Sequence, residues 1–464
     1  MPASRKLQMR PFAPLPSALL VVALGIALFG RPSQAQEESP PAVIPAYGLN
    51  ADRSGSIATY QAGEQPVATA GHAFFQPLGT NDRTCFTCHR PETGWSLSAA
   101  DARARFDRSQ GLEPLFRAHD GATCSTADVS SLEARRHAFA LLTGKGLIRV
   151  RMPMPQAAEF TVRRVADPYA CTGADTVSIY RRPLPATNLR FLATVMWDGR
   201  ETTLASQAID ATLGHAQSAG APSKSQLGQI VGFEAGLYTA QLVDRRAGLL
   251  PGGPVGLAFQ PFFIGINDPT GGNSRGTPFN PRVFTLFDAW NAGPGQDPGA
   301  PQRQSIARGE AIFNTRPIDI TGVGGLNDVV GQRVVRGTCS TCHNAPNVGS
   351  RSIDATLDIG VAGRNPPGLD VAALPVFALA CSKGPMAGEI VETTDPARAL
   401  VTGKCADIGK VKVPALRGLA ARAPYFHNGG ADTLPGVVGF YDRRFRMGLR
   451  PEERVDLVNF LSAL

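Results

Sequence analysis

Residues 84–89 read TCFTCH, and residues 338–343 repeat the pattern as TCSTCH. Each copy has two cysteines separated by two residues, and a histidine directly follows the second cysteine. In c-type cytochromes this spacing lets two thiols form thioether bonds with the two vinyl groups of haem, while the histidine becomes an axial ligand of the iron. The sequence therefore predicts two covalently bound haem c groups. Their attachment residues are Cys85, Cys88, Cys339 and Cys342.

Other uses of a CxxC pair fit these motifs less well. A thioredoxin-like redox pair needs neither the following histidine nor a second copy. A zinc site would require the two pairs to converge and would leave both histidines unused. A disulfide across CxxC is strained and uncommon. The repeated histidine favours haem, with His89 and His343 as the proximal iron ligands.

The remaining four cysteines fall two to each half of the chain. Cys124 and Cys171 follow the first motif, and Cys381 and Cys405 follow the second. In an oxidising compartment we expect two disulfides that staple long loops. Four cysteines allow three connectivities, and we predict pairing within each half from proximity in the sequence.

The N-terminus has the pattern of an export signal. Basic residues precede the apolar run ALLVVALGIALFG (18–30), and small residues precede a cleavage point after Ala35. The run is short for a membrane span, and an uncleaved anchor is the alternative. No later segment is apolar enough to cross a bilayer. We expect a signal peptide at 1–35, a periplasmic location and no stable membrane span.

The charge of the chain argues against nucleic-acid binding. The formal net charge is +8, from 46 basic and 38 acidic residues. Residues 1–35 hold four of the basic and none of the acidic residues, which leaves +4 after cleavage. This weak excess is not gathered into a block of lysines and arginines, so no nucleic-acid partner is expected.

The length and turn content of the chain predict two domains. At 464 residues the chain exceeds what one core usually supports. The run NAGPGQDPGAPQ (291–302) is the best boundary, which gives an N-terminal haem c domain at 36–295 and a C-terminal haem c domain at 303–464. Strand signals are weak, so we expect a mainly α fold with two cytochrome c-like haem domains, long loops and insertions.

The end of the chain predicts a helix. PEERVDLVNFLSAL (451–464) begins with a proline, which is favoured at the first helical position. Its apolar residues recur at helical spacing and define a broad stripe. The members of this stripe are Val455, Leu457, Val458, Leu461 and Leu464.

Three blocks of sequence resemble the bacterial di-haem cytochrome c peroxidase and MauG superfamily. They are FFQPLGTNDRTCFTCHRPETGW (74–95), RRPLPATNLRFLATVMWDGRETTLASQA (181–208) and KVKVPALRGLAARAPYFHNGGADTLPGVVGFYDRRF (410–445). The second block holds the family's WDGR…QA pattern, and the third holds its VPxLR…PYFHxG signature. The stretch 100–180 and much of 216–300 have no counterpart and are treated as insertions.

The resemblance implies roles for several residues. His89 would serve the N-terminal, peroxidatic haem, and His343 would serve the C-terminal, electron-transferring haem. Trp197 would lie between the two haems and couple them. Gln207 falls where the family keeps a glutamine in the distal pocket. His427 would lie near the second haem as a hydrogen-bonding group rather than as an iron ligand.

One acidic residue of the family is missing. Beyond Gln207 the family has a glutamate that acts as acid and base, but this chain reads AIDATLGHAQ at 208–217. Heterolytic cleavage of a peroxide moves a proton from the inner oxygen to the outer one. His215 is the nearest group able to do so. Three roles stay open for it: proton shuttle, iron ligand that blocks the site, or a histidine without a role.

Tyr441 stands fourteen residues after His427, where the peroxidases carry a methionine as second axial ligand. MauG-like members carry tyrosine there. A thioether favours Fe(II), whereas a phenolate favours Fe(III) and higher states. We predict Tyr441 as the ligand. In the alternative, Tyr441 only packs in its helix, and Met386 or Met447 supplies a thioether.

Calcium, which many relatives bind between the domains, is doubtful as a cofactor. The carbonyl donors would lie near Arg422 and Pro424, but Arg182 stands where the family has asparagine. A cation there disfavours Ca²⁺, which requires oxygen ligands and negative charge. Asn188 is an alternative donor, although nothing in the sequence places it at the site.

Together these features predict a periplasmic di-haem c oxidoreductase of the peroxidase type. It would react with hydrogen peroxide at the N-terminal haem and pass or store oxidising equivalents through the C-terminal haem. The electrons would come from a small electron-donor protein, or from a side chain of a protein target that is thereby modified. The alternatives are a di-haem electron-transfer cytochrome without peroxidase activity and an oxygenase that acts on an organic substrate.

Overall fold

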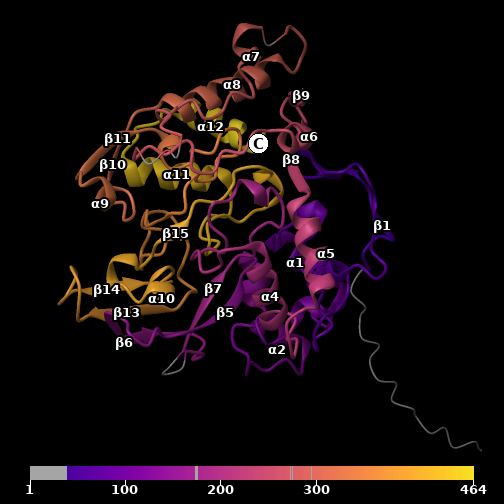
Figure 1. Cartoon of the computed structure of the whole chain (residues 1–464), viewed down its shortest axis with the longest axis vertical. Coiled ribbons are helices and arrows are strands. Elements are labelled where there is room, and N and C mark those ends of the chain that lie inside the picture. The colour runs from indigo at the N-terminus through magenta and orange to yellow at the C-terminus, as the bar shows by residue number, and fades with distance from the viewer. Residues whose placement is uncertain (1–38, 173–175, 272, 274, 294) are drawn as a thin grey trace, which may run out of the picture. The chain divides into compact units, whose positions relative to one another are not determined.

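The computed structural model describes residues 39–464 except 173–175, 272, 274 and 294 (Figure 1). The predicted signal peptide lies outside the described residues and stays a prediction. The described part of the chain is 30% helical and 18% strand, and the strands form several small sheets. The expectation of a mainly α fold is therefore wrong.

The α-helices and strands follow one another in mixed order along the chain. The helices are α1 (Ala99–Ser109), α2 (Leu132–Ala138), α3 (Ala140–Lys145), α4 (Leu204–Gly214), α5 (Lys224–Ala235), α6 (Pro254–Ala258), α7 (Ala289–Ala292), α8 (Ala300–Thr315), α9 (Asn327–Val330), α10 (Ala399–Thr402), α11 (Leu434–Phe445) and α12 (Pro451–Ser462). The strands are β1 (Val43–Ile44), β2 (Tyr47–Ala51), β3 (Gly55–Gln61), β4 (Val67–Ala68), β5 (Ile148–Pro153), β6 (Phe160–Ala166), β7 (Thr176–Arg181), β8 (Leu237–Asp244), β9 (Gly248–Leu249), β10 (Ile318–Thr321), β11 (Val334–Gly337), β12 (Thr356–Leu357), β13 (Val376–Cys381), β14 (Ile390–Thr393) and β15 (Val411–Lys412).

The missed strands lack the pattern that identifies strands in a sequence. β3 and β8 pair antiparallel in a sheet of order β2-β3-β8-β9, and most of their residues are buried. A strand buried on both faces shows no alternation of polar and apolar residues, which is the main strand signal. β3 and β8 pair with each other across a long stretch of sequence, and each also forms a hairpin with its neighbour, β2 or β9.

One sheet joins segments on either side of the predicted domain boundary. β6 pairs antiparallel with β13, and β13 pairs with β14. This sheet shares a hydrophobic cluster with α10, which lies beside it in Figure 1. The N-terminal insertion thus contributes a strand to a sheet of the C-terminal half. The division into domains at 295–303 stays a prediction.

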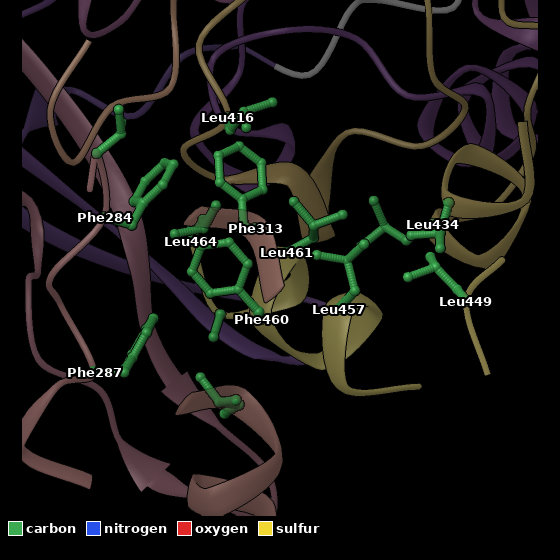
Figure 2. Packing of buried hydrophobic residues seen from close by; sticks show 14 of the residues in the cluster. Phe284, Phe287, Phe313, Leu416, Leu434, Leu449, Leu457, Phe460, Leu461 and Leu464 are labelled. Carbon is green, nitrogen blue, oxygen red and sulfur yellow. The ribbon is translucent and has the colours of Figure 1, made fainter. Parts of the chain in front are cut away.

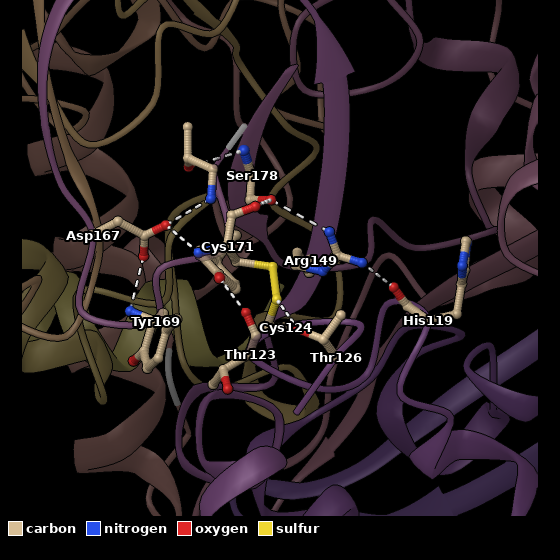
Figure 3. The surroundings of a disulfide bond; sticks show 11 residues. His119, Thr123, Cys124, Thr126, Arg149, Asp167, Tyr169, Cys171 and Ser178 are labelled. Atoms are coloured by element: carbon tan, nitrogen blue, oxygen red, sulfur yellow. Dashed lines mark hydrogen bonds between the residues drawn. A yellow bond between two sulfur atoms is a disulfide. The ribbon is translucent and has the colours of Figure 1, made fainter. Parts of the chain in front are cut away.

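The two predicted disulfides are confirmed. Cys124 bonds to Cys171, and Cys381 bonds to Cys405. Around the first bond, the carboxylate of Asp167 accepts hydrogen bonds from the backbone N–H of Cys171 at 2.8 Å and of Tyr169 at 2.9 Å (Figure 3). This disulfide ties the loop that precedes α2 to the segment before β7.

The largest hydrophobic cluster surrounds α8, α11 and α12. The rings of Phe284, Phe313 and Phe460 meet there with centroids 5.2 to 5.6 Å apart (Figure 2). The helix predicted near the C-terminus is confirmed as α12. Val455, expected on its buried stripe, is 57% exposed, whereas Phe460 is fully buried. The buried positions 457, 460, 461 and 464 are three or four residues apart, or adjacent, as expected for one face of a helix.

The helices α8 and α12 approach each other closely at Gly309. A methyl group on Gly309 would lie 2.1 Å from the backbone oxygen of Asp456 and 2.6 Å from Cβ of Phe460. Both neighbours are fixed parts of α12, so the contact cannot relax without a shift of the helix. Glycine is therefore required here by packing rather than by its backbone conformation.

The helices of the described residues include none that is both long and apolar enough to cross a bilayer.

The Gly309→Ala variant is expected to lower the free energy of unfolding by roughly 2–4 kcal/mol, because overpacking outweighs the better helix propensity of alanine. Gly228→Ala is the matched control: Gly228 lies in α5, is exposed and has no atom near its added methyl group. That control is expected to be as stable as wild type or more stable by up to about 1 kcal/mol. Equal stability of both variants in denaturant titrations would contradict the α8–α12 packing.

Candidate functional site

Each CxxCH motif lines one of two large cavities. The first contains about 1570 Å³ of empty space, part of it open to solvent, and its wall includes Cys85, Cys88 and His89. The second contains about 1300 Å³, and its wall includes the second motif. Both walls are mostly apolar, and none of the four motif cysteines forms a disulfide. Large apolar cavities with a few converging polar groups are typical of cofactor sites.

The same local turn presents both motifs. Residues Cys85–Thr87 form a 3₁₀ turn, in which the backbone N–H of Thr87 donates to the Thr84 hydroxyl at 3.1 Å and the backbone N–H of Thr84 donates to the Thr87 hydroxyl at 3.0 Å. Thr338 and Thr341 repeat this capping box around Cys339–Thr341. The shared TCxTCH sequence thus produces one rigid turn twice, because both threonines satisfy backbone groups that a short turn leaves open.

Both motif histidines are held in one tautomer. The Nδ1–H of His89 donates to the backbone oxygen of Trp95 at 2.9 Å, and the Nδ1–H of His343 donates to that of Gly349 at 2.6 Å. Because a carbonyl only accepts, each bond leaves the lone pair on Nε2. Burial lowers the pKa of His343 to about 4, so this ring is neutral. A neutral imidazole oriented through its other nitrogen is typical of a metal ligand.

The first cavity also contains the two distal residues that the sequence singled out. Gln207 lies on α4, His215 caps the C-terminal end of this helix, and both line the cavity together with His89. The structure therefore brings these three predicted residues to one site. His72, which has no family match, does not line this cavity: its ring accepts from the backbone N–H of Phe74.

A carboxylate that the sequence analysis missed orients His215. The Nδ1–H of His215 donates to Oδ2 of Asp120 at 2.7 Å, and the Arg83 guanidinium binds the other oxygen of this carboxylate. Burial by itself raises the pKa of Asp120, but Arg83 and the hydrogen bond from His215 outweigh it and hold that pKa below its usual range. The ionised carboxylate fixes the His215 tautomer with its lone pair on Nε2.

The segment that carries Asp120 is anchored on several sides. The backbone N–H of Arg149 donates to the Asp120 carbonyl at 2.7 Å, and the Arg149 guanidinium donates to the carbonyl of His119. The Cys124–Cys171 disulfide holds the same loop a few residues later (Figure 3). Asp120 lies inside the insertion and far from His215 in sequence, so no local pattern could have identified it.

Trp197, which the resemblance expects between two haems, lines both cavities. Its indole N–H donates to the Arg182 carbonyl at 2.7 Å, and its own carbonyl accepts from the backbone N–H of Lys412 at 2.8 Å. The ring meets the ring of His427 edge to face, with centroids 6.0 Å apart. Trp197 is thus fixed in orientation at the wall that the two cavities share.

His427 lines the second cavity and is 1% exposed. Neither of its ring nitrogens has a hydrogen-bond partner among the described residues, and the nearest carboxylate oxygen, on Asp395, is 3.8 Å from Nε2. Burial lowers the pKa of His427 to about 4, so the ring is neutral. A buried imidazole with two open positions is suited to a hydrogen bond with a group inside the cavity.

The structure separates the candidate axial ligands of the second site. Tyr441 lies on α11 and lines the second cavity, and burial raises the pKa of its phenol. Met447 lines the same cavity and is 7% exposed. Met386 instead packs against the hydrophobic cluster beside β13 and lies in neither cavity. Tyr441 and Met447 therefore remain candidates, and Met386 does not.

A guanidinium occupies the place that the resemblance assigns to calcium. The Arg182 side chain donates to the Arg422 carbonyl at 2.7 Å and to the Leu97 carbonyl. Asn188 lies elsewhere, because its side chain exchanges hydrogen bonds with the backbone of Thr239 at 2.9 and 3.1 Å. Within the described ranges, no group of three or more His, Cys, Asp or Glu side chains is arranged to hold a metal ion. The carbonyl that calcium would need is already bound by a cation.

Glu234 is a second acidic residue that the sequence analysis missed. It lies near the end of α5, lines the first cavity and is 5% exposed, and its Oε2 has no hydrogen-bond partner. Burial raises the pKa of this carboxyl to about 8. The group is therefore a neutral acid near pH 7. Its helix belongs to the second insertion, for which the sequence offered no counterpart.

The residues present fit a haem c group in each cavity. None of the motif thiols forms a disulfide, and each histidine offers Nε2 to an iron. A buried cation, Lys412, lines both cavities. A haem brings two propionate carboxylates, which match such cations, because a buried charge is stable only when it is paired.

The resemblance to bacterial cytochrome c peroxidases is confirmed by comparison with curated proteins. The chain is 33% identical over 141 residues to cytochrome-c peroxidase IdrP2 of Denitromonas iodatirespirans, which covers 28% of this chain and 36% of that protein. It is 31% identical over 140 residues to cytochrome c551 peroxidase of Nitrosomonas europaea. This alignment covers 30% of this chain and 34% of that protein. The chain thus spans about a third of the length of these relatives. No protein-family model matches the chain.

Two solved structures are similar at a low level. A MauG-like protein associated with microbial copper homeostasis aligns with a TM-score of 0.40 and 13% identity, over 85% of this chain and 88% of that chain. A variant of the di-haem peroxidase BthA from Burkholderia thailandensis aligns with a TM-score of 0.32 and 14% identity, over 91% and 95%.

The Glu234→Gln variant is expected to change how stability depends on pH. The pKa of Glu234 is raised on folding, so the folded state holds its proton between pH 4.5 and 8, and stability falls as pH rises through this window. Glutamine should remove this loss, which is roughly 1–4 kcal/mol between pH 5 and pH 8. Thermal unfolding midpoints at the two pH values measure it, with the exposed Glu133→Gln as control. The same pH dependence in both variants would contradict the buried neutral carboxyl.

Proposed function

We propose that this protein is a periplasmic di-haem oxidoreductase of the peroxidase type, with one haem c in each cavity. The observation that carries the proposal is the duplicated site: a cysteine pair without a disulfide on a capped turn, followed by a histidine whose Nδ1–H donates to a backbone carbonyl. The similarity to cytochrome c peroxidases supports the same activity. When bound, the haem groups supply the iron at which hydrogen peroxide is reduced and the electrons that reduce it.

His215 supplies the proton transfer that the family assigns to a glutamate. Its Nε2 accepts the proton from the inner oxygen of hydrogen peroxide and returns it to the outer oxygen, which leaves as water. Asp120 holds the Nδ1–H, so that the lone pair of the neutral ring is on Nε2, and it stabilises the imidazolium that forms, as a buried carboxylate does for a catalytic histidine. Gln207, in the first turn of α4, lines the same cavity and orients the peroxide by hydrogen bonding.

Electrons pass from the haem of the second cavity to the haem of the first cavity. Trp197 lines both cavities, as Lys412 and Pro414 do, and it is the aromatic side chain among them. With a haem in the second cavity, Tyr441 would bind its iron through the phenolate oxygen, and His427 would form a hydrogen bond inside the same cavity. The electrons come from a small donor protein or from an oxidised side chain of a protein target. A phenolate ligand favours the higher oxidation states and thereby the second source.

A di-haem electron-transfer cytochrome is the second candidate, and one observation favours it. The Asp120–His215 pair has the geometry of a carboxylate-supported metal ligand as well as that of a catalytic base. If Nε2 of His215 ligates the first iron, both irons are six-coordinate and peroxide has no open position. The two candidates differ in the spin state of the first haem and in its reaction with peroxide.

The ferric protein is expected to react with hydrogen peroxide, which stopped-flow haem spectra would measure. His215→Ala should lower the second-order rate constant by about 10²–10⁴-fold, the usual contribution of a general acid–base. Asp120→Asn should lower it less and shift its pH profile, because the tautomer is no longer fixed. His137→Ala, at an exposed position of α2, should leave the rate unchanged. A His215→Ala protein that reacts faster than wild type and turns high-spin would identify His215 as a ligand instead.

The two remaining candidate ligands of the second haem can be separated by substitution. Tyr441→Phe should remove the phenolate-to-iron charge-transfer absorption and change the ferric electron paramagnetic resonance signal of one haem, while Met447→Leu should leave both as in wild type. Leucine conserves most of the volume of methionine, so this variant serves as the packing control. The opposite pattern would assign the ligand to Met447.

A further inference from the structure

Lys412 is a buried lysine at the wall between the two cavities. It ends the short strand β15, which pairs with β12, and it is 4% exposed. Its side chain lines the first cavity and the second cavity. The backbone of the same residue donates to the carbonyl of Trp197, so the lysine and the tryptophan are held together at this wall.

The ammonium group of Lys412 lacks an anionic partner. Within the part of the chain that the structure describes, no carboxylate lies at ion-pair distance from it, and no side-chain hydrogen bond engages it. Burial alone lowers its pKa to about 7. A buried ammonium without a counter-ion loses its hydration and gains nothing in return, so either it is deprotonated or an anion completes the site.

A second buried cation lies beside Lys412. Arg351 is 3% exposed, and its Nε and Nη1 have no hydrogen-bond partner. Arg351 and Lys412 both border a small recess that has no room for a water molecule, and Arg351 lines neither large cavity. Burial lowers the pKa of Arg351, which Cys342 and Asp268 only partly offset. Arg351 therefore adds a second positive charge near Lys412, and a carboxylate can reach Lys412 only from the two large cavities.

We propose that Lys412 is a cation shared by the two haem sites: its ammonium binds a propionate carboxylate of each haem and so sets the reduction potentials of both irons. This inference rests on the proposed function, because the carboxylates are those of the haem groups. It adds a residue for which neither the sequence motifs nor the resemblance gave a role. A positive charge near an iron disfavours the ferric state, so it raises the reduction potential.

Lys410 provides a matched control two residues away. Its ammonium pairs with Asp328 and Asp407, each at 3.2 Å, and its side chain lines neither cavity. Lys410→Met and Lys412→Met therefore remove the same group from the same segment, but only the second removes a charge that faces the cavities. Lys412→Arg keeps the charge.

Spectroelectrochemical titration of the purified holoprotein tests the proposal. In Lys412→Met both midpoint potentials should fall, each by about 59 mV or more, which is a tenfold change in a one-electron equilibrium. Lys412→Arg should stay near wild type, and Lys410→Met should match wild type. If Lys412→Met does not fold, Lys412→Gln takes its place in the same comparison.

The outcomes separate this inference from the proposed function. A fall in only one potential shows that Lys412 serves one haem and is not shared, and unchanged potentials show that it binds neither carboxylate. Either result overturns the inference about Lys412. The proposed function still stands if the wild-type protein carries two haems and reacts with peroxide. A wild-type protein without covalent haem overturns both.

Discussion

The hydrogen bond from each motif histidine to a backbone carbonyl is the interaction on which both sites depend. It fixes the tautomer that leaves the lone pair on Nε2, while burial in the apolar cavities lowers the pKa of both imidazoles. The capped turn before each histidine brings the two thiols to the same wall. Without this fixed tautomer the cysteines could still anchor a haem, but the iron would lack its proximal ligand.

Each of the two insertions contributes an acidic side chain to the wall of the first cavity. Asp120 comes from the first insertion and orients His215, and Glu234 comes from the second and adds a buried neutral acid. The glutamate that the family pattern places beyond Gln207 is absent, yet two acidic side chains adjoin the cavity from other elements. Proton transfer in this protein is therefore proposed to use a histidine supported by a carboxylate.

The parts of the molecule with local signals were predictable, and the parts made by distant contacts were not. The CxxCH motifs and α12 follow from spacing within short segments, and the disulfides follow from pairing the cysteines within each half. The resemblance singled out Tyr441, which lines the second cavity. The mainly α expectation failed because β3 and β8 are buried on both faces and pair across the chain. Asp120, Glu234 and Lys412 were missed because the role of a single charged residue depends on neighbours that are distant in the sequence.

The claim that each cavity holds a covalently attached haem is tested most directly by intact mass spectrometry of the denatured, reduced protein. Wild type should exceed its polypeptide mass by two haem groups. The double variants Cys85→Ser with Cys88→Ser, and Cys339→Ser with Cys342→Ser, should each exceed theirs by one. A polypeptide mass without haem in protein exported by cells that mature c-type cytochromes, or a disulfide within either CxxC pair, would contradict the account.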